Sequence, residues 1–419
     1  MLRGLRNVRR YTEILEVLLR YGFHDLVQDL ELPPPPAREG TAAPPPRPVG
    51  PAPRPVLLRM AMEELGPTFI KLGQVLSMRP DLVPAEWAEE FKRLQTDCPV
   101  IGFDAVKARL EESFPGTVWK LFASIEAEPL AAGSMAQVHR AVLRTGERVV
   151  VKVLRPGIRE KIAVDVDILR RAARLAESRS GDLAFSPGAV VEEFGREIRK
   201  EVDLRREGRA TDGFRGLFRD DPEVGFPRVY WEATTRDVLT VEEIEGAVLA
   251  RTPVATICPP DRRRLVPNGA RAILQQCLEF GFFHVDPHPG NLIAQPGGKL
   301  VFIDCGMNGR LDEATTGRLA DLIAAVVDCD ADRFAEVILE LTDSDPEELD
   351  ERTFRSDMRD VMGGFEQATL DRFDLSGLLT ELFERLRRHR LRVPGDLVLL
   401  LKSIGTMRPS AGSWTRCST

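Results

Sequence analysis

The sequence has no long apolar run, although it extends over 419 residues. Its most apolar stretches, LIAAVV at 322–327 and LVLLL at 397–401, are far shorter than the roughly 20 residues of a membrane-spanning helix and are typical of buried helices. The arginine-rich N-terminus has neither an apolar core nor a small-residue cleavage site, so it is not a secretory signal. We therefore expect a cytoplasmic protein without a transmembrane segment.

Aromatic residues are also scarce, at 6% of the residues, and the chain has no excess of positive charge, since its formal net charge is −7. A nucleic-acid-binding protein needs a basic stripe or a platform of stacking rings, so this class of partner is excluded. The six cysteines are scattered and contain no C-x-x-C pair. They fit a reducing compartment better than a disulfide framework or a structural zinc site.

The N-terminal part of the chain divides into segments of different composition. Residues 1–30 predict one amphipathic helix that packs on the body of the protein or, alternatively, lies on a membrane surface. Residues 31–55 predict an extended linker, because eleven prolines fall within them. Residues 56–128 predict a helical extension. Its elements are a helix from Val56, a second helix capped near Pro84, and further helix over 104–127.

The composition becomes rich in β-branched residues at residue 129 and mostly helical again after about residue 260. The elements expected between them are a hairpin about Thr145 and Gly146, helices over 159–178 and 187–210, and a hairpin over 228–246. A small β-rich lobe over 129–246 and a helical lobe over 247–419 predict an α+β, bilobal fold.

The chemistry is concentrated in the loop FHVDPHPGNL at 283–292 and the strand that follows it. The loop contains Asp286 and Asn291, and the strand ends at Asp304, two residues before Gly306. Phosphoryl transfer needs an oriented nucleophile and Mg²⁺ held by hard oxygen ligands. The order D-x-x-x-x-N, then D-x-G at a strand end, is the layout of kinases.

Two other interpretations of these residues remain open. Asp286, Asn291 and Asp304 are residue types that commonly stabilise turns. His284, Asp286 and His288 also form an H-x-D-x-H cluster that could ligate zinc. The zinc interpretation is less favoured, because the chain has only five histidines and no further cluster completes a hydrolase site.

A kinase also needs a cation on the phosphates, and Lys152 ends an apolar β-run in which its neighbours point to the opposite face. Within the expected helix over 187–210, Asp203 and Glu207 form a like-charge pair. Arg206 could partly neutralise Asp203, and Glu201 could pair with Arg205. The functional alternative is an ion pair between Glu207 and Lys152, as in the helix αC pair of kinases.

The Gly-rich loop of ordinary protein kinases is missing. In its place, AAGSMAQVH at 131–139 puts methyl groups where phosphates usually meet bare backbone. An ordinary protein kinase is therefore disfavoured.

Together these motifs resemble the UbiB/AarF-type (ADCK-like) atypical kinases, closely over about 56–310 and more loosely to about 405. The matching motifs are K-x-G-Q with Lys71, Gly73 and Gln74; the Ala-rich loop with Ala131, Ala132, Gly133 and Ser134; E-x-D with Glu201 and Asp203; Glu207 as the αC glutamate; and the loops VDPHPGN and DCG.

The resemblance implies an ATP-dependent atypical kinase or ATPase that binds Mg²⁺ and ATP and supports isoprenoid-quinone (ubiquinone) biosynthesis. Asp286, Lys152 and Glu207 would be catalytic, Asn291 and Asp304 would hold the metal, and residues 131–134 would contact the nucleotide. The implied partners are the nucleotide, membrane lipid and quinone-biosynthesis proteins, with peripheral attachment at the inner face of a membrane.

In this family the K-x-G-Q helices fold over the active site. Lys71 and Gln74 lie opposite the apolar stripe of their helix, and Gly73 in mid-helix indicates close approach by another element, since glycine there costs about 1 kcal/mol relative to alanine. A lid formed by these helices is therefore the expectation.

The sequence departs from the family pattern in three places. Cys305 replaces the usual Phe, and Gly133 replaces a third alanine. The C-terminus is polar where the family commonly has two transmembrane helices, so we expect a truncated or altered end.

Two further function classes stay open. A small-molecule kinase of the aminoglycoside-phosphotransferase type is favoured by VDPHPGN and disfavoured by IKLGQ. A catalytically silent pseudokinase scaffold is disfavoured by the retention of Lys152, Glu207, Asp286, Asn291 and Asp304.

Overall fold

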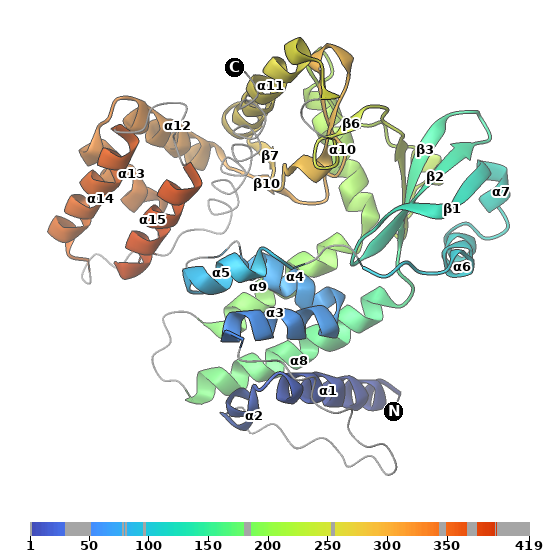
Figure 1. The fold of residues 1–419 in the computed structure, drawn as a ribbon, viewed down its shortest axis with the longest axis horizontal. Coiled ribbons are helices and arrows are strands. Elements are labelled where there is room, and N and C mark those ends of the chain that lie inside the picture. The colour runs from blue at the N-terminus through green and yellow to red at the C-terminus, as the bar shows by residue number, and fades with distance from the viewer. Residues whose placement is uncertain are drawn as a thin grey trace. The chain divides into compact units, whose positions relative to one another are not determined.

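A computed structural model describes residues 2–29, 52–77, 79, 82–94, 98–179, 186–252, 256–342, 349–366, 375–389 and 391 (Figure 1). The chain folds into two compact units. The first unit comprises Met1–Gly146, Val150–Asp203 and Thr235–Val238, and the second comprises Glu147–Val149, Leu204–Thr234 and Leu239–Thr419. The five-segment division expected from composition stays a prediction.

Helices form most of the first unit. They are α1 (Leu2–Arg20), α2 (His24–Asp29), α3 (Arg54–Leu65), α4 (Pro67–Ser77), α5 (Ala85–Phe91), α8 (Ile158–Arg179) and α9 (Pro187–Glu201). Helix α1, in dark blue, packs against α8, and α4 packs on α3, α5 and α9 (Figure 1). Phe69, Phe91 and Leu94 are buried in the core between these helices, which fixes the position of the K-x-G-Q segment.

Two helices expected to be continuous are broken at glycines. The helix expected over 1–30 ends before Gly22 (φ +84°), and the helix expected from Val56 starts at Arg54 and breaks at Gly66 (φ +92°). Positive φ is accessible to glycine without steric cost, and Pro67 after Gly66 fits the first turn of a new helix. The expected cap at Pro84 is confirmed by α5. The predicted linker falls outside the described residues up to residue 51.

A β-rich region contains α6 (Phe103–Ser113), α7 (Val118–Leu121), β1 (Phe122–Ala132), β2 (Ala136–Leu143), β3 (Arg148–Leu154) and β5 (Val238–Glu242). Its sheet has the order β1-β2-β3-β5, with Phe122 opposite Leu143 in the antiparallel β1–β2 pair. The turn at Gly146 is confirmed. The expected helix over 104–127 is wrong at its end, because pairing with β2 and full burial of Phe122 override the helix propensity of 122–127.

A further break separates α9 from α10 (Leu204–Leu217), where one helix was expected over 187–210. The Arg159 guanidinium donates to the carbonyl oxygen of Val202 at 2.9 and 2.6 Å, so the main chain turns out of the helix there. Asp203 therefore lies outside any helix and does not share a helical face with Glu207. Its carboxylate lies 3.9 Å from Arg236.

The second unit is built from short strands and longer helices. The strands are β4 (Val224–Gly225), β6 (Ala247–Val248), β7 (Phe282–His284), β8 (Leu292–Ala294), β9 (Leu300–Phe302) and β10 (Asn308–Arg310). They form a sheet of order β4-β9-β8-β6 and an antiparallel β7–β10 pair. The helices are α10, α11 (Pro259–Leu278), α12 (Glu313–Val327), α13 (Ala331–Leu341), α14 (Glu351–Glu366) and α15 (Leu375–Arg388), with 3₁₀ turns at Trp231–Ala233, Pro289–Asn291 and Pro296–Gly298.

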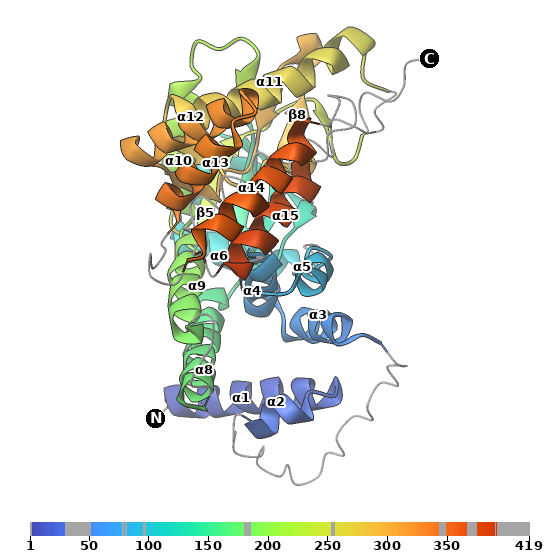
Figure 2. The same cartoon turned by 90° about the vertical axis from the view of Figure 1, so that its left-hand side faces the viewer.

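Stacked phenylalanines hold the centre of the second unit together. Phe214 of α10 stacks on Phe282 of β7 with ring centroids 4.2 Å apart, and Phe226 stacks on Phe302 of β9 at 5.2 Å. The strands that lead into the polar loops are therefore anchored in the core. Helices α14 and α15, in red, lie side by side (Figure 2).

The remaining expectations for this region have mixed outcomes. The mostly helical character after residue 260 is confirmed. The hairpin expected over 228–246 is reduced to β5 and one antiparallel bridge between Val229 and Val241. In the described part of the chain, no helix combines the length and the apolar character needed to cross a membrane.

Candidate functional site

The loop between β7 and β8 carries Asp286 and Asn291 and is held by main-chain bonds. The amide of Val285 donates to the carbonyl oxygen of Met307 at 3.0 Å, and the amide of Asn291 donates to that of His288 at 2.9 Å. The Asn291 side-chain Nδ2 donates to the carbonyl oxygen of Asp286 at 3.1 Å. These bonds fold the loop on itself, so that Asn291 is fixed against Asp286.

Asn291 and Asp304 are brought together by strand pairing. In the antiparallel β8–β9 pair, Leu292 lies opposite Phe302. The register continues beyond the strands, because the amide of Ile303 donates to the carbonyl oxygen of Asn291 at 3.0 Å. Asn291 therefore lies beside the residue that precedes Asp304, although the two site residues are far apart in the sequence.

Asp304 begins a tight turn that also meets Glu207. The amide of Gly306 donates to Oδ1 of Asp304 at 3.0 Å. A Cβ atom on Gly306 would lie 3.1 Å from Oδ1 of Asp304 and 3.4 Å from Oε2 of Glu207. The buried Glu207 carboxylate, carried by α10, thus flanks the same glycine as Asp304. Cys305 is buried in the hydrophobic core of this unit.

His284 joins the two polar loops and is not a metal ligand. Its Nε2 donates to the main-chain carbonyl oxygen of Asp304, and its Nδ1 accepts from the amide of Asp286. Burial lowers the pKa of His284, so the ring is neutral with its proton on Nε2. Because both ring nitrogens are used, His284 cannot bind zinc. The described residues also contain no group of three or more His, Cys, Asp and Glu placed to hold a metal.

In the first unit, Lys152 lies on β3 as the alternation predicts. Val149, Val151 and Val153 are buried, whereas Lys152 on the other face is half-buried. The expected Lys152–Glu207 pair joins residues of different units and stays a prediction.

The Ala-rich loop connects β1 and β2 in the same unit. The amide of Gly133 donates to the carbonyl oxygen of Ala136 at 2.9 Å. The carbonyl oxygen of Gly133 accepts from Nε of Arg155 at 2.9 Å. Sequence reasoning missed Arg155, because its role depends on a contact with a loop far away in the chain.

The K-x-G-Q helix α4 is linked to α9 by an ion pair between the family motifs. Nζ of Lys71 lies 2.9 Å from Oε1 of Glu201, and the Lys71 side chain is only 13% exposed. The close approach expected at Gly73 is confirmed, since a Cβ atom there would lie 2.3 Å from Cδ1 of Leu94. Sequence reasoning assigned Lys71 and Glu201 to separate motifs and missed the pair.

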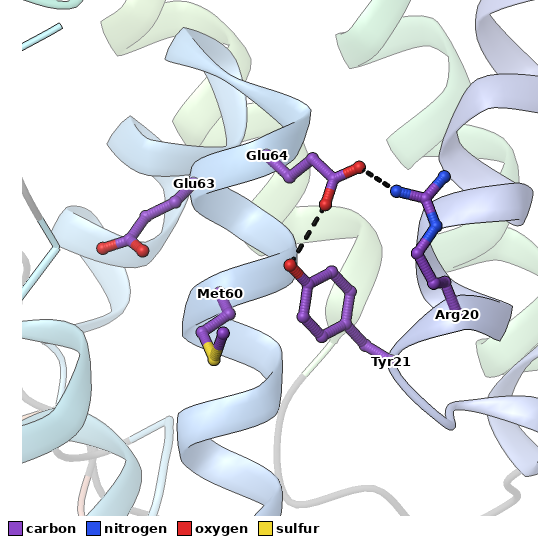
Figure 3. A pocket seen from close by; sticks show the side chains of 5 residues that line it. All are labelled: Arg20, Tyr21, Met60, Glu63 and Glu64. Atoms are coloured by element: carbon purple, nitrogen blue, oxygen red, sulfur yellow. Dashed lines mark hydrogen bonds and ion pairs between the residues drawn. The ribbon is translucent and has the colours of Figure 1, made fainter. Parts of the chain in front are cut away.

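A hollow of about 480 Å³ lies elsewhere in the first unit (Figure 3). It is lined by Arg20, Tyr21, Met60, Glu63 and Glu64. Glu64 accepts from the Tyr21 hydroxyl at 3.0 Å and pairs with Arg20, so it joins α1 to α3. None of the residues singled out in the sequence lines this hollow.

Comparison with protein families gives two matches. The ABC1 atypical kinase-like domain matches residues 93–338, and the UbiB helical domain matches residues 358–407.

Individual proteins agree with the family matches. An uncharacterized protein of Synechocystis sp. is 34% identical over 84% of this chain, which spans 60% of that protein's length. A probable protein kinase UbiB of Pseudomonas fluorescens is 34% identical over 96% of this chain and 76% of that protein. A Mycobacterium tuberculosis protein solved in complex with erythromycin has a TM-score of 0.56 at 21% identity, covering 84% of this chain and 90% of that one. The expected α+β, bilobal kinase-like fold is thereby confirmed, and the chain belongs to the ABC1/UbiB family of atypical kinases.

Proposed function

We propose that this chain is an ATPase or kinase of the UbiB type that binds ATP with Mg²⁺ and supports isoprenoid-quinone (ubiquinone) biosynthesis. The observation that carries the proposal is the bond between the Ile303 amide and the Asn291 carbonyl oxygen, which brings the metal-ligand candidates Asn291 and Asp304 together.

The donor set fits Mg²⁺. The Asn291 amide nitrogen is bonded to Asp286, which orients the amide oxygen as the ligand atom. With the carboxylate of Asp304, the set consists of oxygens, the ligands that Mg²⁺ prefers. When bound, Mg²⁺ would neutralise charge on the phosphates. Asp286, in the same loop, would orient the nucleophile and accept its proton.

Two features of the first unit would serve the nucleotide. Lys152 would contact the α- and β-phosphates and be oriented by Glu207, as in kinases. Residues 131–134 would contact the nucleotide through a loop in which the polar backbone groups of Gly133 are already bonded within the protein. Fewer amides would then be available for phosphate than in a Gly-rich loop.

The acceptor of the phosphate would be water or a small molecule. Lys71 forms an ion pair with Glu201 and is little exposed. This supports a structural role for α4, because a paired and little-exposed lysine is not available to bind a peptide substrate. The lid expected from the family resemblance would leave Asp286 accessible only to small nucleophiles. Slow ATP hydrolysis is the expected activity.

The biosynthetic role rests on relatives named probable protein kinase UbiB. Membrane lipid and quinone-biosynthesis proteins are the proposed partners, and the chain would reach them through peripheral association with a membrane.

A small-molecule phosphotransferase is the second candidate function. It is supported by the VDPHPGN loop, in which Asp286 is held by bonds to His284 and Asn291. A pseudokinase scaffold is the third and is disfavoured by the retained polar set.

The test is ATP turnover by the purified chain, with and without lipid vesicles, aminoglycosides and protein acceptors. Acceptor-free hydrolysis stimulated by lipid supports the UbiB-type proposal. Stoichiometric transfer to an aminoglycoside supports the second candidate. Binding of lipid or protein without any turnover supports the scaffold.

A further inference from the structure

A short segment without regular secondary structure, residues 98–101, is hydrogen-bonded to the β1–β2 hairpin that carries the Ala-rich loop; we call it the strap. The amide of Cys98 donates to the carbonyl oxygen of Ala132 at 2.9 Å. The buried Gln137 side chain bonds to both main-chain groups of Ile101, at 2.9 and 3.2 Å. The strap is thus bonded to the hairpin near both of its ends.

Arg155, just after β3, connects the strap with the loop. Its Nε donates to the carbonyl oxygen of Gly133 at 2.9 Å, and its Nη2 donates to that of Pro99, also at 2.9 Å. Its own amide donates to the carbonyl oxygen of Met135 at 2.9 Å. Burial lowers the pKa of the Arg155 guanidinium, but arginine stays charged at physiological pH, so these are charge-assisted bonds.

The bonding pattern leaves the turn of the loop with few alternative conformations. Both main-chain polar groups of Gly133 are engaged, the amide by Ala136 and the carbonyl by Arg155. A Cβ atom at residue 133 would lie 3.3 Å from the carbonyl oxygen of Ala136, so the backbone approach is close. The planar guanidinium can hold two carbonyl groups at a fixed separation, which a lysine ammonium cannot do with the same geometry.

We infer that Arg155 is a positioning residue for nucleotide binding: it fixes the Ala-rich loop against the strap in the conformation that receives the nucleotide. The inference rests on the proposed function for its ligand, a nucleoside di- or triphosphate with Mg²⁺. Without the bridge, the loop adopts several conformations, of which one receives the nucleotide. The apparent affinity for nucleotide is then the intrinsic affinity multiplied by the fraction of molecules in that conformation.

The test uses the full chain and three variants. Arg155→Ala removes the bridge. Arg155→Lys keeps the positive charge but loses the planar guanidinium that bonds two carbonyl groups at once. Arg144→Ala is the matched control, because Arg144 lies in the turn between β2 and β3 and its Nε likewise donates to a main-chain carbonyl, that of Trp119, at 2.9 Å. Mg-ADP and Mg-ATP are titrated calorimetrically. We expect about tenfold weaker binding for Arg155→Ala, partial recovery for Arg155→Lys, and wild-type affinity for Arg144→Ala.

A second measurement separates this inference from the proposed function. Hydrogen exchange of the amides in 131–136 is followed without nucleotide, and it should be faster in Arg155→Ala than in wild type or Arg144→Ala. If wild type fails to bind Mg-nucleotide, the proposed function fails, and the exchange result alone decides whether Arg155 fixes the loop. If Arg155→Ala does not fold, the comparison is made with Arg155→Lys. Unchanged exchange, or equal affinities for folded Arg155 and Arg144 variants, overturns the inference.

Discussion

The imidazole of His284 donates a hydrogen bond from Nε2 to the main-chain carbonyl oxygen of Asp304, while its Nδ1 accepts from the amide of Asp286. One neutral, buried ring thus joins the loop that carries Asp286, the candidate catalytic residue, to the turn that begins at Asp304, a candidate metal ligand. His284→Leu should destabilise the protein by about 1–3 kcal/mol, because buried main-chain groups lose their partners. It should also weaken Mg-nucleotide binding. Urea unfolding and titration calorimetry measure the two effects, and wild-type affinity in a destabilised variant would contradict the link.

The pH dependence of unfolding should also report on His284. Burial lowers its pKa in the folded state, so the unfolded state takes up the proton first as the pH falls. Its contribution to stability is complete above the ordinary histidine pKa of about 6.5 and decreases below it, by at most about 1.4 kcal/mol per pH unit. The buried His139 has a lowered pKa too and contributes equally to both proteins. Unfolding free energies between pH 7.5 and 5.5 should therefore fall more steeply in wild type than in His284→Leu; parallel curves would refute this.

Asp304→Asn should abolish Mg-dependent nucleotide binding while the protein stays folded, since the amide keeps the size of the carboxylate but loses its charge. Mg-ATP at about 100 times its Kd should stabilise wild type by about 2.7 kcal/mol. The control is Asp312→Asn, because Asp312 caps α12 and asparagine caps equally well. Equal ligand-induced stabilisation of wild type and Asp304→Asn would show that the metal assignment is wrong.

Lys152 and Glu207 should act as a unit in nucleotide binding, since each would lose its function without the other. Lys152→Met and Glu207→Gln should each weaken Mg-ATP binding by about tenfold or more, and the double variant should be little worse than either single one. Calorimetric titration of wild type and the three variants with Mg-ATP gives the affinities for this double-mutant cycle. Additive losses would count against the ion pair.

Replacement of Lys71 by alanine should weaken nucleotide binding and the control of ATP hydrolysis, because the ion pair with Glu201 holds the K-x-G-Q helix on α9. Arg79→Ala provides a matched control: Arg79 pairs with Glu193 of the same helix at 3.4 Å but is outside the motif. The Lys71→Ala and Arg79→Ala variants are compared by steady-state ATP hydrolysis and by titration with Mg-ADP. Equal behaviour of both variants, or efficient phosphorylation of casein-like proteins by wild type, would contradict a lid.

Membrane association of this chain should be peripheral and salt-sensitive. The basic N-terminal helix, which carries Arg3, Arg6, Arg9 and Arg10, could bind anionic headgroups. High salt and carbonate should each release the protein from membranes, as followed by immunoblotting of pellet and supernatant. Retention in the pellet after both washes would show an anchor that these features do not include.

Local patterns were sufficient for several conclusions. The alternation around Lys152 predicted its face of β3, Gly73 predicted a close contact, and the spacing of Asp286, Asn291 and Asp304 indicated a kinase-like site. Such features depend on neighbours within a few residues, where periodicity and turn chemistry operate. The same reasoning failed at Gly66, where a positive φ ends a helix whose apolar stripe continues, and at Val202, where a distant arginine takes the carbonyl group.

The sequence by itself determined the family motifs, the residue types of the site and the α+β class, because these follow from composition, spacing and resemblance. Only the tertiary structure decided which distant residues hold the motifs and site residues in place. The His284–Asp304 bond, the Lys71–Glu201 pair and the Arg155–Gly133 bond each join residues well separated in the chain. No local pattern encodes such partners, since a hydrogen bond forms only when folding brings donor and acceptor to about 3 Å in a suitable orientation.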